Sequence, residues 1–106
     1  KDAVAMTLFF LERQDIGGIF NVGSGKARNW NDLAKSIFLA MNKQLNIEYI
    51  DMPSEIRNQY QYHTCSDTEK IRNVGYSQSI MSLEEGIDDY VTHYLIPGRH
   101  LGAGIE

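Results

Sequence analysis

The chain has 106 residues, of which 42% are hydrophobic and 23% charged, and this composition is ordinary for one compact globular domain. Its formal net charge of −4 argues against general nucleic-acid binding, because no block of basic residues offsets the acidic ones. A single cysteine, Cys65, excludes an internal disulfide and fits a reducing, cytoplasmic compartment. No apolar run approaches the roughly 18 residues that a membrane span needs, and the first residues do not resemble a signal peptide. Because the chain starts at Lys1 rather than Met, we expect it to be part of a longer protein.

The first predicted element is a helix over residues 3–13, with Asp2 as its N-cap. Its apolar residues cover most of its circumference, so the helix needs cover on two sides. We expect one side to pack on this chain and the other on protein outside it. The two apolar faces consist of Val4, Leu8 and Leu11, and of Ala3, Met6 and Phe10.

A short buried strand is predicted over Ile19–Val22, followed by a sharp turn at Gly23-Ser24-Gly25. A helix over residues 30–41, capped by Asn29, comes next, and a second strand is predicted over 47–50. Strand, helix and strand over this distance imply a parallel pair with a right-handed crossover, so the predicted fold class is α/β. The apolar face of this helix consists of Trp30, Leu33, Ala34, Ile37, Phe38 and Met41.

Two capping-box sequences predict the remaining helices. Ser66 to Glu69 opens a short helix that Gly75 ends, and Ser82 to Glu85 opens a helix that extends to about residue 95. Pro97-Gly98 breaks that last helix. We therefore expect one domain over residues 1–96, with about four helices, and a mobile tail over 97–106.

Gly23-Ser24-Gly25-Lys26 has the composition of a phosphate-binding loop but not its spacing. A nucleotide P-loop has four residues between its glycines and a hydroxyl residue after the lysine, whereas this turn has one residue between them and then Ala27. The third glycine of a dinucleotide-binding fingerprint is also missing. We expect the turn to be scaffold, not a phosphate cradle.

His63, Cys65 and Asp67 alternate along the chain, as metal ligands on one face of an extended segment would. A closed zinc site needs further ligands, and no second His/Cys pair supplies them. Nothing else marks His63 as a base for a nucleophilic cysteine. We expect no metal site, and we expect Asp67 to start a helix.

The segment over residues 53–62 is the strongest candidate for ligand contact, because open α/β sheets bind ligands just after the carboxyl end of a strand. It contains a guanidinium, Arg57, that can bind phosphate oxygens, and two phenols, Tyr60 and Tyr62, that can donate hydrogen bonds to a sugar. The alternative is a solvated loop with Tyr62 packed against the domain.

Several motifs, in this order and spacing, resemble the carboxyl-terminal part of the extended short-chain dehydrogenase/reductases, which are NAD-dependent epimerases and dehydratases of sugar nucleotides. The resemblance covers residues 1 to about 95. The motifs are Phe20-Asn21-Val22-Gly23-Ser24-Gly25, Ser66-Asp67, Gly75-Tyr76 and Ser82-Leu83-Glu84-Glu85-Gly86.

Within that superfamily the chain is most similar to the ADP-L-glycero-D-manno-heptose 6-epimerase family. The resemblance is carried by Ile47-Glu48-Tyr49-Ile50-Asp51-Met52-Pro53, by Tyr60-Gln61 with Thr64 and Asp67, and by Lys1-Asp2-Ala3-Val4. It implies that Tyr60 contacts the substrate. Gln59 stands where other members have a basic residue, and Arg57 is the candidate to replace it.

The resemblance implies the small substrate-binding domain of an enzyme that inverts C6″ of ADP-heptose for the lipopolysaccharide core, using tightly bound NADP. The Rossmann domain that binds NADP and carries the catalytic Tyr-x-x-x-Lys is absent from this chain, so the fragment is expected to be inactive. The parent protein is expected to be a cytoplasmic homo-oligomer that binds neither nucleic acid nor membrane. The alternatives are a UDP-hexose 4-epimerase or dTDP-sugar dehydratase and, in another class, a stand-alone binding module.

Overall fold

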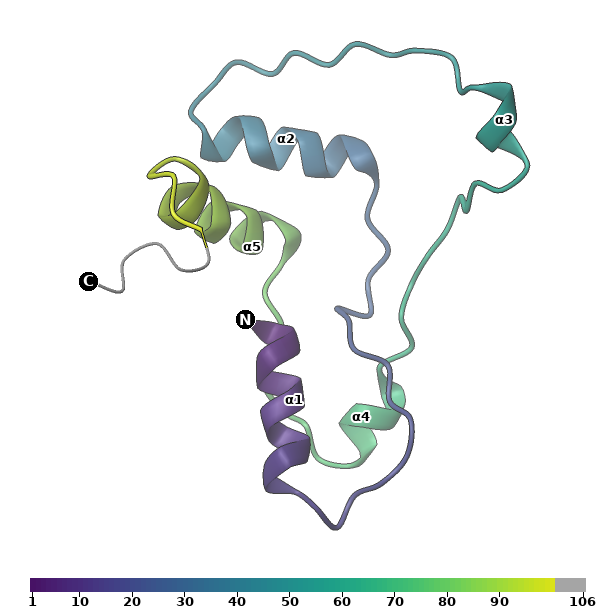
Figure 1. The fold of residues 1–106 in the computed structure, drawn as a ribbon, viewed down its shortest axis with the longest axis vertical. Helices are drawn as coiled ribbons and strands as arrows, with labels where there is room; N and C mark the ends of the chain where they lie inside the picture. The colour runs from purple at the N-terminus through teal and green to yellow at the C-terminus, as the bar shows by residue number, and fades with distance from the viewer. Residues whose placement is uncertain (101–106) are drawn as a thin grey trace. The chain divides into compact units, whose positions relative to one another are not determined.

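The predicted α/β fold with two parallel strands is wrong. A computed structural model describes residues 1–100, and over that range it contains helices and irregular segments but no β-strand. Figure 1 shows these elements in chain order. They are α1 (Asp2–Glu12), α2 (Trp30–Ala40), α3 (Ser54–Arg57), α4 (Glu69–Asn73), α5 (Leu83–Tyr90) and the π-helix η1 (Val91–Leu95).

Both predicted strands are exposed, irregular backbone. Ile19 is 88% exposed and Ile50 is 82% exposed, so neither apolar run is a buried strand. A strand needs a neighbouring strand to pair with its N–H and C=O groups. The segment from Ile19 is instead held by side chains, because the Lys70 ammonium donates to the Ile19 carbonyl at 2.8 Å and the Asn21 amide donates to the Asp67 carbonyl at 3.1 Å.

The chain divides into two compact units, each built from two segments that are distant in sequence. Unit 1 consists of Lys1–Ala27 and Tyr62–Met81. Unit 2 consists of Arg28–Gln61 and the chain from Ser82 onward. Contacts between distant segments therefore hold each unit together.

The core of unit 1 joins α1 to α4. Met6 and Ile71 are each 1% exposed, and Tyr76, just after α4, is 2% exposed. The Phe9 ring meets the Tyr76 ring edge to face, with centroids 5.4 Å apart, an arrangement that aromatic pairs favour. The residues that pack around this core are Phe9, Phe10, Phe20 and Ile80.

One face of α1 remains exposed. Val4 is 61% exposed and Leu11 is 65% exposed, and Leu8 between them is also exposed. Met6 and Phe10 face the core. The prediction that α1 packs on this chain through only one side is confirmed.

The start of α1 differs from the prediction. Lys1 is the residue at the N-cap, and Asp2 is already helical. The Asp2 carboxylate accepts a hydrogen bond from the Met81 backbone N–H at 3.3 Å. Asp2 therefore links the first and last residues of unit 1 instead of capping the helix.

The end of α4 follows the prediction at Gly75. Gly75 has a φ of +103°, and its N–H donates to the Arg72 carbonyl at 3.0 Å. The Tyr76 N–H donates to the Ile71 carbonyl at 3.2 Å, which completes a Schellman motif. Since Ile71 and Tyr76 are both buried, the pair that ends the helix also forms the core.

The start of α4 lacks the predicted capping box. Thr68 precedes the helix without a side-chain cap, and Asp67 Oδ1 accepts from the Glu69 N–H at 2.9 Å. Asp67 is thus a helix-start residue, as predicted. Ser66, predicted as the cap, instead accepts from the Gly25 N–H at 3.2 Å through its hydroxyl.

The glycine turn lies very close to residues 66–68. A Cβ on Gly23 would lie 2.9 Å from Ser66 Cβ and closer still to its hydroxyl, and a Cβ on Gly25 would lie 2.8 Å from Thr68 Oγ1. Gly25 also has a φ of +70°, which L side chains rarely adopt. The close approach therefore requires glycine at both positions, and the turn serves as scaffold.

In unit 2, α2 is bounded by local signals that the sequence shows. Asn29 Oδ1 accepts from the Asp32 N–H at 2.8 Å, which is the predicted N-cap. At the other end Asn42 has a φ of +52°, and the Lys43 N–H donates to the Phe38 carbonyl at 2.9 Å. The helix ends one residue before the predicted boundary.

The capping box of α5 is confirmed. The Ser82 hydroxyl accepts from the Glu85 N–H at 3.1 Å, and Glu85 Oε2 accepts from the Ser82 N–H at 2.7 Å. The same backbone N–H lowers the pKa of the Glu85 carboxyl.

The last predicted helix is not α-helical throughout. α5 stops at Tyr90, and η1 continues with π-helical spacing, in which the Ile96 N–H donates to the Val91 carbonyl at 2.9 Å. Val91 is 2% exposed and anchors this turn. Gly98 follows with a φ of +64°. Residues 101–106 of the predicted mobile tail lie outside the described residues.

Among residues 1–100, no helix has both the length and the apolar character needed to cross a membrane.

We expect Gly23→Ala to destabilise unit 1 by about 1–3 kcal/mol, because the new methyl group overlaps the Ser66 side chain. Amide hydrogen exchange at Tyr76, whose N–H is bonded in the core of unit 1, measures this loss. The control is Gly17→Ala in the same unit, since a Cβ there meets nothing within 4 Å. Equal protection of Tyr76 in both variants would contradict the close approach.

Candidate functional site

The candidate site is the segment over residues 53–62 of the sequence, which lies mainly in unit 2. It begins with Pro53, continues as the four-residue helix α3 and is mostly exposed. Figure 1 shows α3 between two long irregular stretches. With no strand before it, the segment is not at the edge of a sheet, and the sheet argument for ligand contact does not apply.

Tyr60 is half-buried and bonded to α2. Its phenolic oxygen accepts a hydrogen bond from the indole Nε1–H of Trp30 at 2.7 Å. Thirty residues separate the two in sequence, and both belong to unit 2. The structure therefore connects the predicted substrate-contact residue to the first turn of the helix that follows the glycine turn.

Trp30 was predicted on the apolar face of α2, and that prediction is wrong, because its side chain is 71% exposed. Side chains on a helix lean toward its N-terminus, so a residue in the first position extends beyond the helix instead of covering its neighbours. Hydrophobic periodicity treats every position of a helix alike, so it does not distinguish the first residue from the others. The position of Trp30 directly after the N-cap was the available signal.

Arg57, the second predicted contact, is exposed and lies at the last position of α3. Its Nη2 donates to the Met52 carbonyl at 3.4 Å, a long hydrogen bond within the same segment. The guanidinium is therefore oriented loosely by its own loop.

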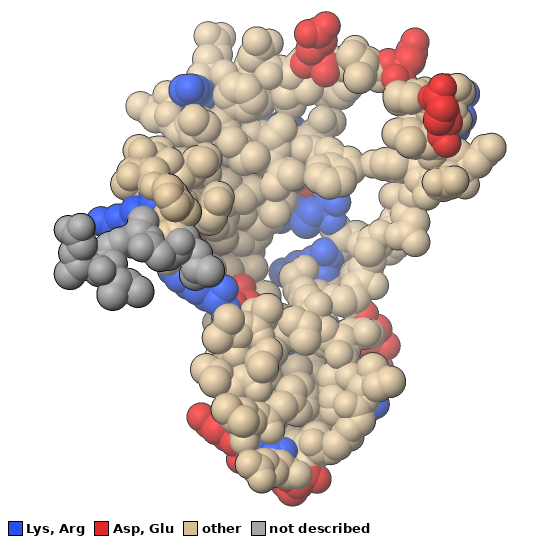
Figure 2. Space-filling view, in the orientation of Figure 1, with Lys and Arg blue, Asp and Glu red and all other residues tan. Residues whose placement is uncertain are grey.

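The candidate segment over residues 53–62 has one carboxylate and one guanidinium, but the longer stretch over residues 47–61 is mainly negative. That stretch contains three carboxylates, Glu48, Asp51 and Glu55, and one guanidinium, Arg57. Figure 2 shows red acidic groups along the stretch that leads to α3. Arg57 is the one cation of this stretch.

The glycine turn does not offer its backbone to a ligand at Gly25. That N–H is bonded to the Ser66 hydroxyl, and the spaces beside Gly23 and Gly25 are filled by Ser66 and Thr68. The amide of Lys26 is bonded to the Ser24 hydroxyl at 3.2 Å. These contacts are those of a packed turn.

His63, Cys65 and Asp67 do not form a metal-binding cluster in the structure. Within residues 1–100 no group of three His, Cys, Asp or Glu side chains is placed to hold a metal ion. Cys65 is an exposed thiol, and Asp67 is bonded to the start of α4.

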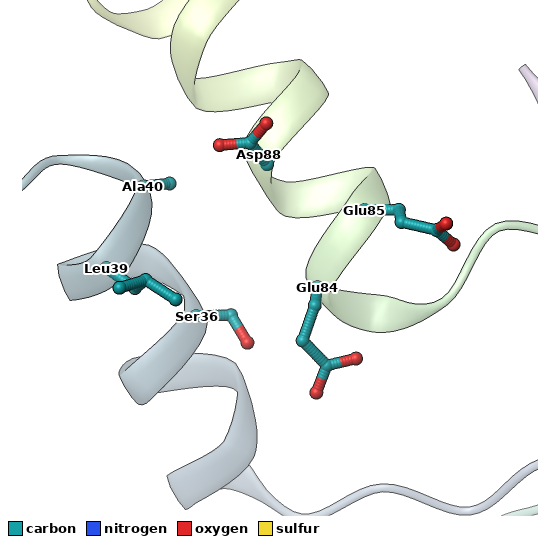
Figure 3. A pocket seen from close by; sticks show the side chains of 6 residues that line it. All are labelled: Ser36, Leu39, Ala40, Glu84, Glu85 and Asp88. Carbon is teal, nitrogen blue, oxygen red and sulfur yellow. The ribbon is translucent and has the colours of Figure 1, made fainter.

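A hollow of about 270 Å³ lies between α2 and α5. In Figure 3 the side chains of Glu84 and Ser36 lie in the space between the two helices, whereas Glu85 points away from α2. Two polar side chains of the lining are hydrogen-bonded within the chain. Ser36 donates to the Asp32 carbonyl, and Glu85 caps α5. The lining residues are Ser36, Leu39, Ala40, Glu84, Glu85 and Asp88.

Arg28 joins α2 to α5 beside this hollow. It makes two hydrogen bonds to the Glu84 carboxylate, one of them 3.0 Å from Nη1 to Oε2, and its Nε lies 3.2 Å from Asp32 Oδ2. A planar guanidinium and a carboxylate match in this two-bond geometry. The bonds lower the pKa of Glu84 from 4.5 to about 2 and raise the pKa of Arg28. Sequence reasoning missed this pair, because 56 residues separate its members.

No protein-family model matches the chain. Curated relatives do match it over most of its length. They include proteins of Nitratidesulfovibrio vulgaris strain DP4 (43% identity, 90% of this chain, 29% of the relative), Fusobacterium nucleatum subsp. nucleatum (38%, 90% and 30%) and Pseudomonas paraeruginosa (33%, 85% and 32%).

The chain is thus homologous to part of a sugar-nucleotide isomerase. Each of these relatives is named ADP-L-glycero-D-manno-heptose-6-epimerase, so the family resemblance found in the sequence is confirmed. The chain spans about 30% of the length of these relatives, which is consistent with the carboxyl-terminal portion that its motifs indicate.

We expect the stability of unit 2 to fall as the pH drops from about 4.5 to about 2, because Glu84 must be protonated over that range and then loses its bonds to Arg28. The pKa of Glu84 is lowered in the folded state, so its contribution is complete above 4.5 and is lost below it. Glu84→Gln should flatten this part of the pH profile, measured as the Tm at pH 6, 4 and 3 by circular dichroism.

The control is Asp88→Asn, which removes the same charge one turn further along α5. It should keep the acid dependence of the unmodified chain. An equally steep profile for Glu84→Gln would show that the pair with Arg28 does not cause it.

Proposed function

We propose that the chain is the substrate-binding portion of an ADP-L-glycero-D-manno-heptose 6-epimerase, an enzyme that inverts C6″ of ADP-heptose. The observation that supports this proposal is 43% identity over 90% of the chain to a relative of that name. The product would supply heptose for the lipopolysaccharide core, and the reaction would take place in the cytoplasm. The parent protein is a homo-oligomer in this proposal.

Tyr60 and Arg57 are the substrate contacts in this proposal. Tyr60 is half-buried, and its phenolic oxygen accepts a hydrogen bond from the Trp30 indole N–H. Arg57 is the cation of an otherwise acidic stretch, so it is the group that would meet a phosphate oxygen.

The heptose, more than the diphosphate, fits this segment. Over residues 47–61, three carboxylates stand against one guanidinium, and this charge disfavours two bound phosphates and favours the hydroxyl groups of a sugar. The proposed orientation therefore places the sugar at Tyr60.

The residues of this chain do not fit a site for NADP. The sequence contains no dinucleotide-binding glycine fingerprint and no Tyr-x-x-x-Lys, and the Gly25 amide is bonded within the chain. We propose that NADP and the catalytic residues belong to an amino-terminal Rossmann domain of the parent protein. About 70% of the length of the relatives lies outside the match, which is room for such a domain.

The isolated chain should therefore not interconvert the two ADP-heptose epimers, even with NADP added. Product analysis by proton NMR, with the parent protein as the positive control, measures this. Turnover by residues 1–106 alone would contradict the assignment of catalysis to another domain.

In the parent enzyme, Tyr60→Phe should raise the KM for ADP-heptose about 3- to 10-fold, because one hydrogen bond to the sugar is lost at a cost of about 0.5–1.5 kcal/mol. Bound NADP should be unchanged. Initial rates against ADP-heptose and, in parallel, UDP-glucose measure both the effect and the choice of nucleotide.

The matched control is Tyr90→Phe, which removes another phenol of unit 2 that is 59% exposed. An unchanged KM for Tyr60→Phe would contradict its role. A preference for UDP-glucose in the unmodified enzyme would contradict the proposed substrate.

A further inference from the structure

One side of α1 presents aliphatic side chains to solvent. Val4 is 61% exposed, Leu8 49% and Leu11 65%, and their spacing of four and three residues places them on one side of the helix. We call these three residues the outer face of α1. The hydroxyl of Thr7, beside Leu8 in the chain, donates to the Ala3 carbonyl of the same helix at 2.8 Å.

The middle of α1 contains no charged residue. From residue 3 to residue 11 every side chain is uncharged, and the charges of the helix stand at its two ends, as Asp2 and Glu12. A helix side that stays in water normally carries charged or polar residues. The outer face therefore has the composition of a surface that another part of a protein covers.

The exposed apolar side chains of unit 1 lie mostly on its first segment. Among the residues that the structure describes, five large exposed hydrophobic residues of this unit fall in Lys1–Ala27 and two in Tyr62–Met81. Three of the five form the outer face, and the other two, Ile19 and Val22, follow α1 in the chain. A partner that covers unit 1 would therefore meet this first segment.

The relatives indicate which protein lies next to α1. About 70% of their length is outside the match, and the proposed function assigns that length to an amino-terminal domain. Such a domain precedes α1 in the chain, and α1 begins at Asp2. The domain is therefore tethered directly to the helix that carries the outer face.

The small size of the outer face favours a tethered partner over a separate one. A stable complex between two separate proteins uses roughly 20–30 residues on each side, and the outer face has three. A domain in the same chain is present at a high effective concentration, so a smaller contact is enough to hold it.

We propose that the outer face of α1 docks on an apolar surface of the amino-terminal domain of the parent protein. This inference rests on the proposed function only for the existence of that domain. Met6, on the other side of the helix, is already buried in the core of unit 1, so α1 has protein on both sides once the domain is in place.

Cysteine labelling of the parent protein in a Cys65→Ser background tests the inference. Leu8→Cys and Leu11→Cys should react with N-ethylmaleimide at least about tenfold more slowly than Gly17→Cys, because a covered thiol reacts only when the contact opens. Gly17 is the reference, since it is exposed in the same unit and a Cβ there meets nothing within 4 Å. Mass spectrometry of the labelled peptides measures the rates, and equal rates at the three positions would overturn the inference.

Amide hydrogen exchange tests the same contact without a substitution, so it decides the matter even if a cysteine variant folds poorly. Relative to the Tyr76 amide in the core of unit 1, the amides of α1 should exchange at least about tenfold more slowly in the parent protein than in the 106-residue chain. The same ratio in both proteins would overturn the inference.

A second copy of the chain is the alternative occupant of the outer face. Analytical ultracentrifugation of the 106-residue chain should show a monomer. A dimer that Leu8→Asp dissociates, and that Leu39→Asp on α2 leaves intact, would assign the outer face to a second copy and overturn the inference.

The failure of the proposed function is distinguishable from the failure of this inference, because labelling does not depend on the substrate. A parent protein that protects Leu8→Cys but does not act on ADP-heptose would overturn the proposed function and support the docking. An active parent protein in which Leu8→Cys reacts as fast as Gly17→Cys would overturn the docking alone.

Discussion

The contact between the glycine turn and residues 66–68 is the constraint on which unit 1 depends. Gly25 donates its N–H to Ser66, and the missing side chains at Gly23 and Gly25 make room for Ser66 and Thr68. About 40 residues of sequence separate the two segments, so this contact fixes where α4 starts. Once α4 is placed, Ile71 and Tyr76 reach Met6 and complete the core.

In the irregular part of this unit, side chains form the hydrogen bonds to backbone groups that a neighbouring strand would form in a sheet. Lys70 and Asn21 bond to backbone carbonyls that a neighbouring strand would otherwise satisfy, and Arg72 donates to the carbonyls of Tyr76 and Gln78 at 3.0 and 2.7 Å. Backbone polar groups need partners whether or not a sheet forms. Charged and amide side chains are the partners here, and they come from α4 and from the segment after the first helix.

Unit 2 depends on a different kind of contact, which links its fold to the candidate site. Arg28 connects α2 with α5, and two residues later Trp30 connects α2 with Tyr60. The residue that joins the two helices and the residue bonded to the proposed substrate contact therefore lie within three consecutive positions, 28–30.

Local signals in the sequence predicted local structure well. The Asn29 cap, the Ser82 capping box and the Gly75 helix end are each decided by residues within a few positions, and all three are present. Predictions that required a partner elsewhere were the ones that failed. The predicted strands had no neighbouring strand to pair with. Ser66 and Asp2, predicted as helix caps, are bonded to distant segments instead. Trp30, predicted on the apolar face of α2, is bonded to Tyr60. Periodicity describes one element and does not specify which other element it meets.

The π-helical turn of η1 changes the direction in which the side chains after it point. Each residue of an α-helix advances by about 100°, so the extra residue in a π turn rotates all later side chains by about that angle relative to the stripe of α5. Leu95, at the end of this turn, is 50% exposed. One residue could be lost between Thr92 and Tyr94 by rewinding this turn to α spacing, with Val91 still buried before it. The turn is therefore the place in this helix where an insertion or a deletion is absorbed without moving the segments that precede it.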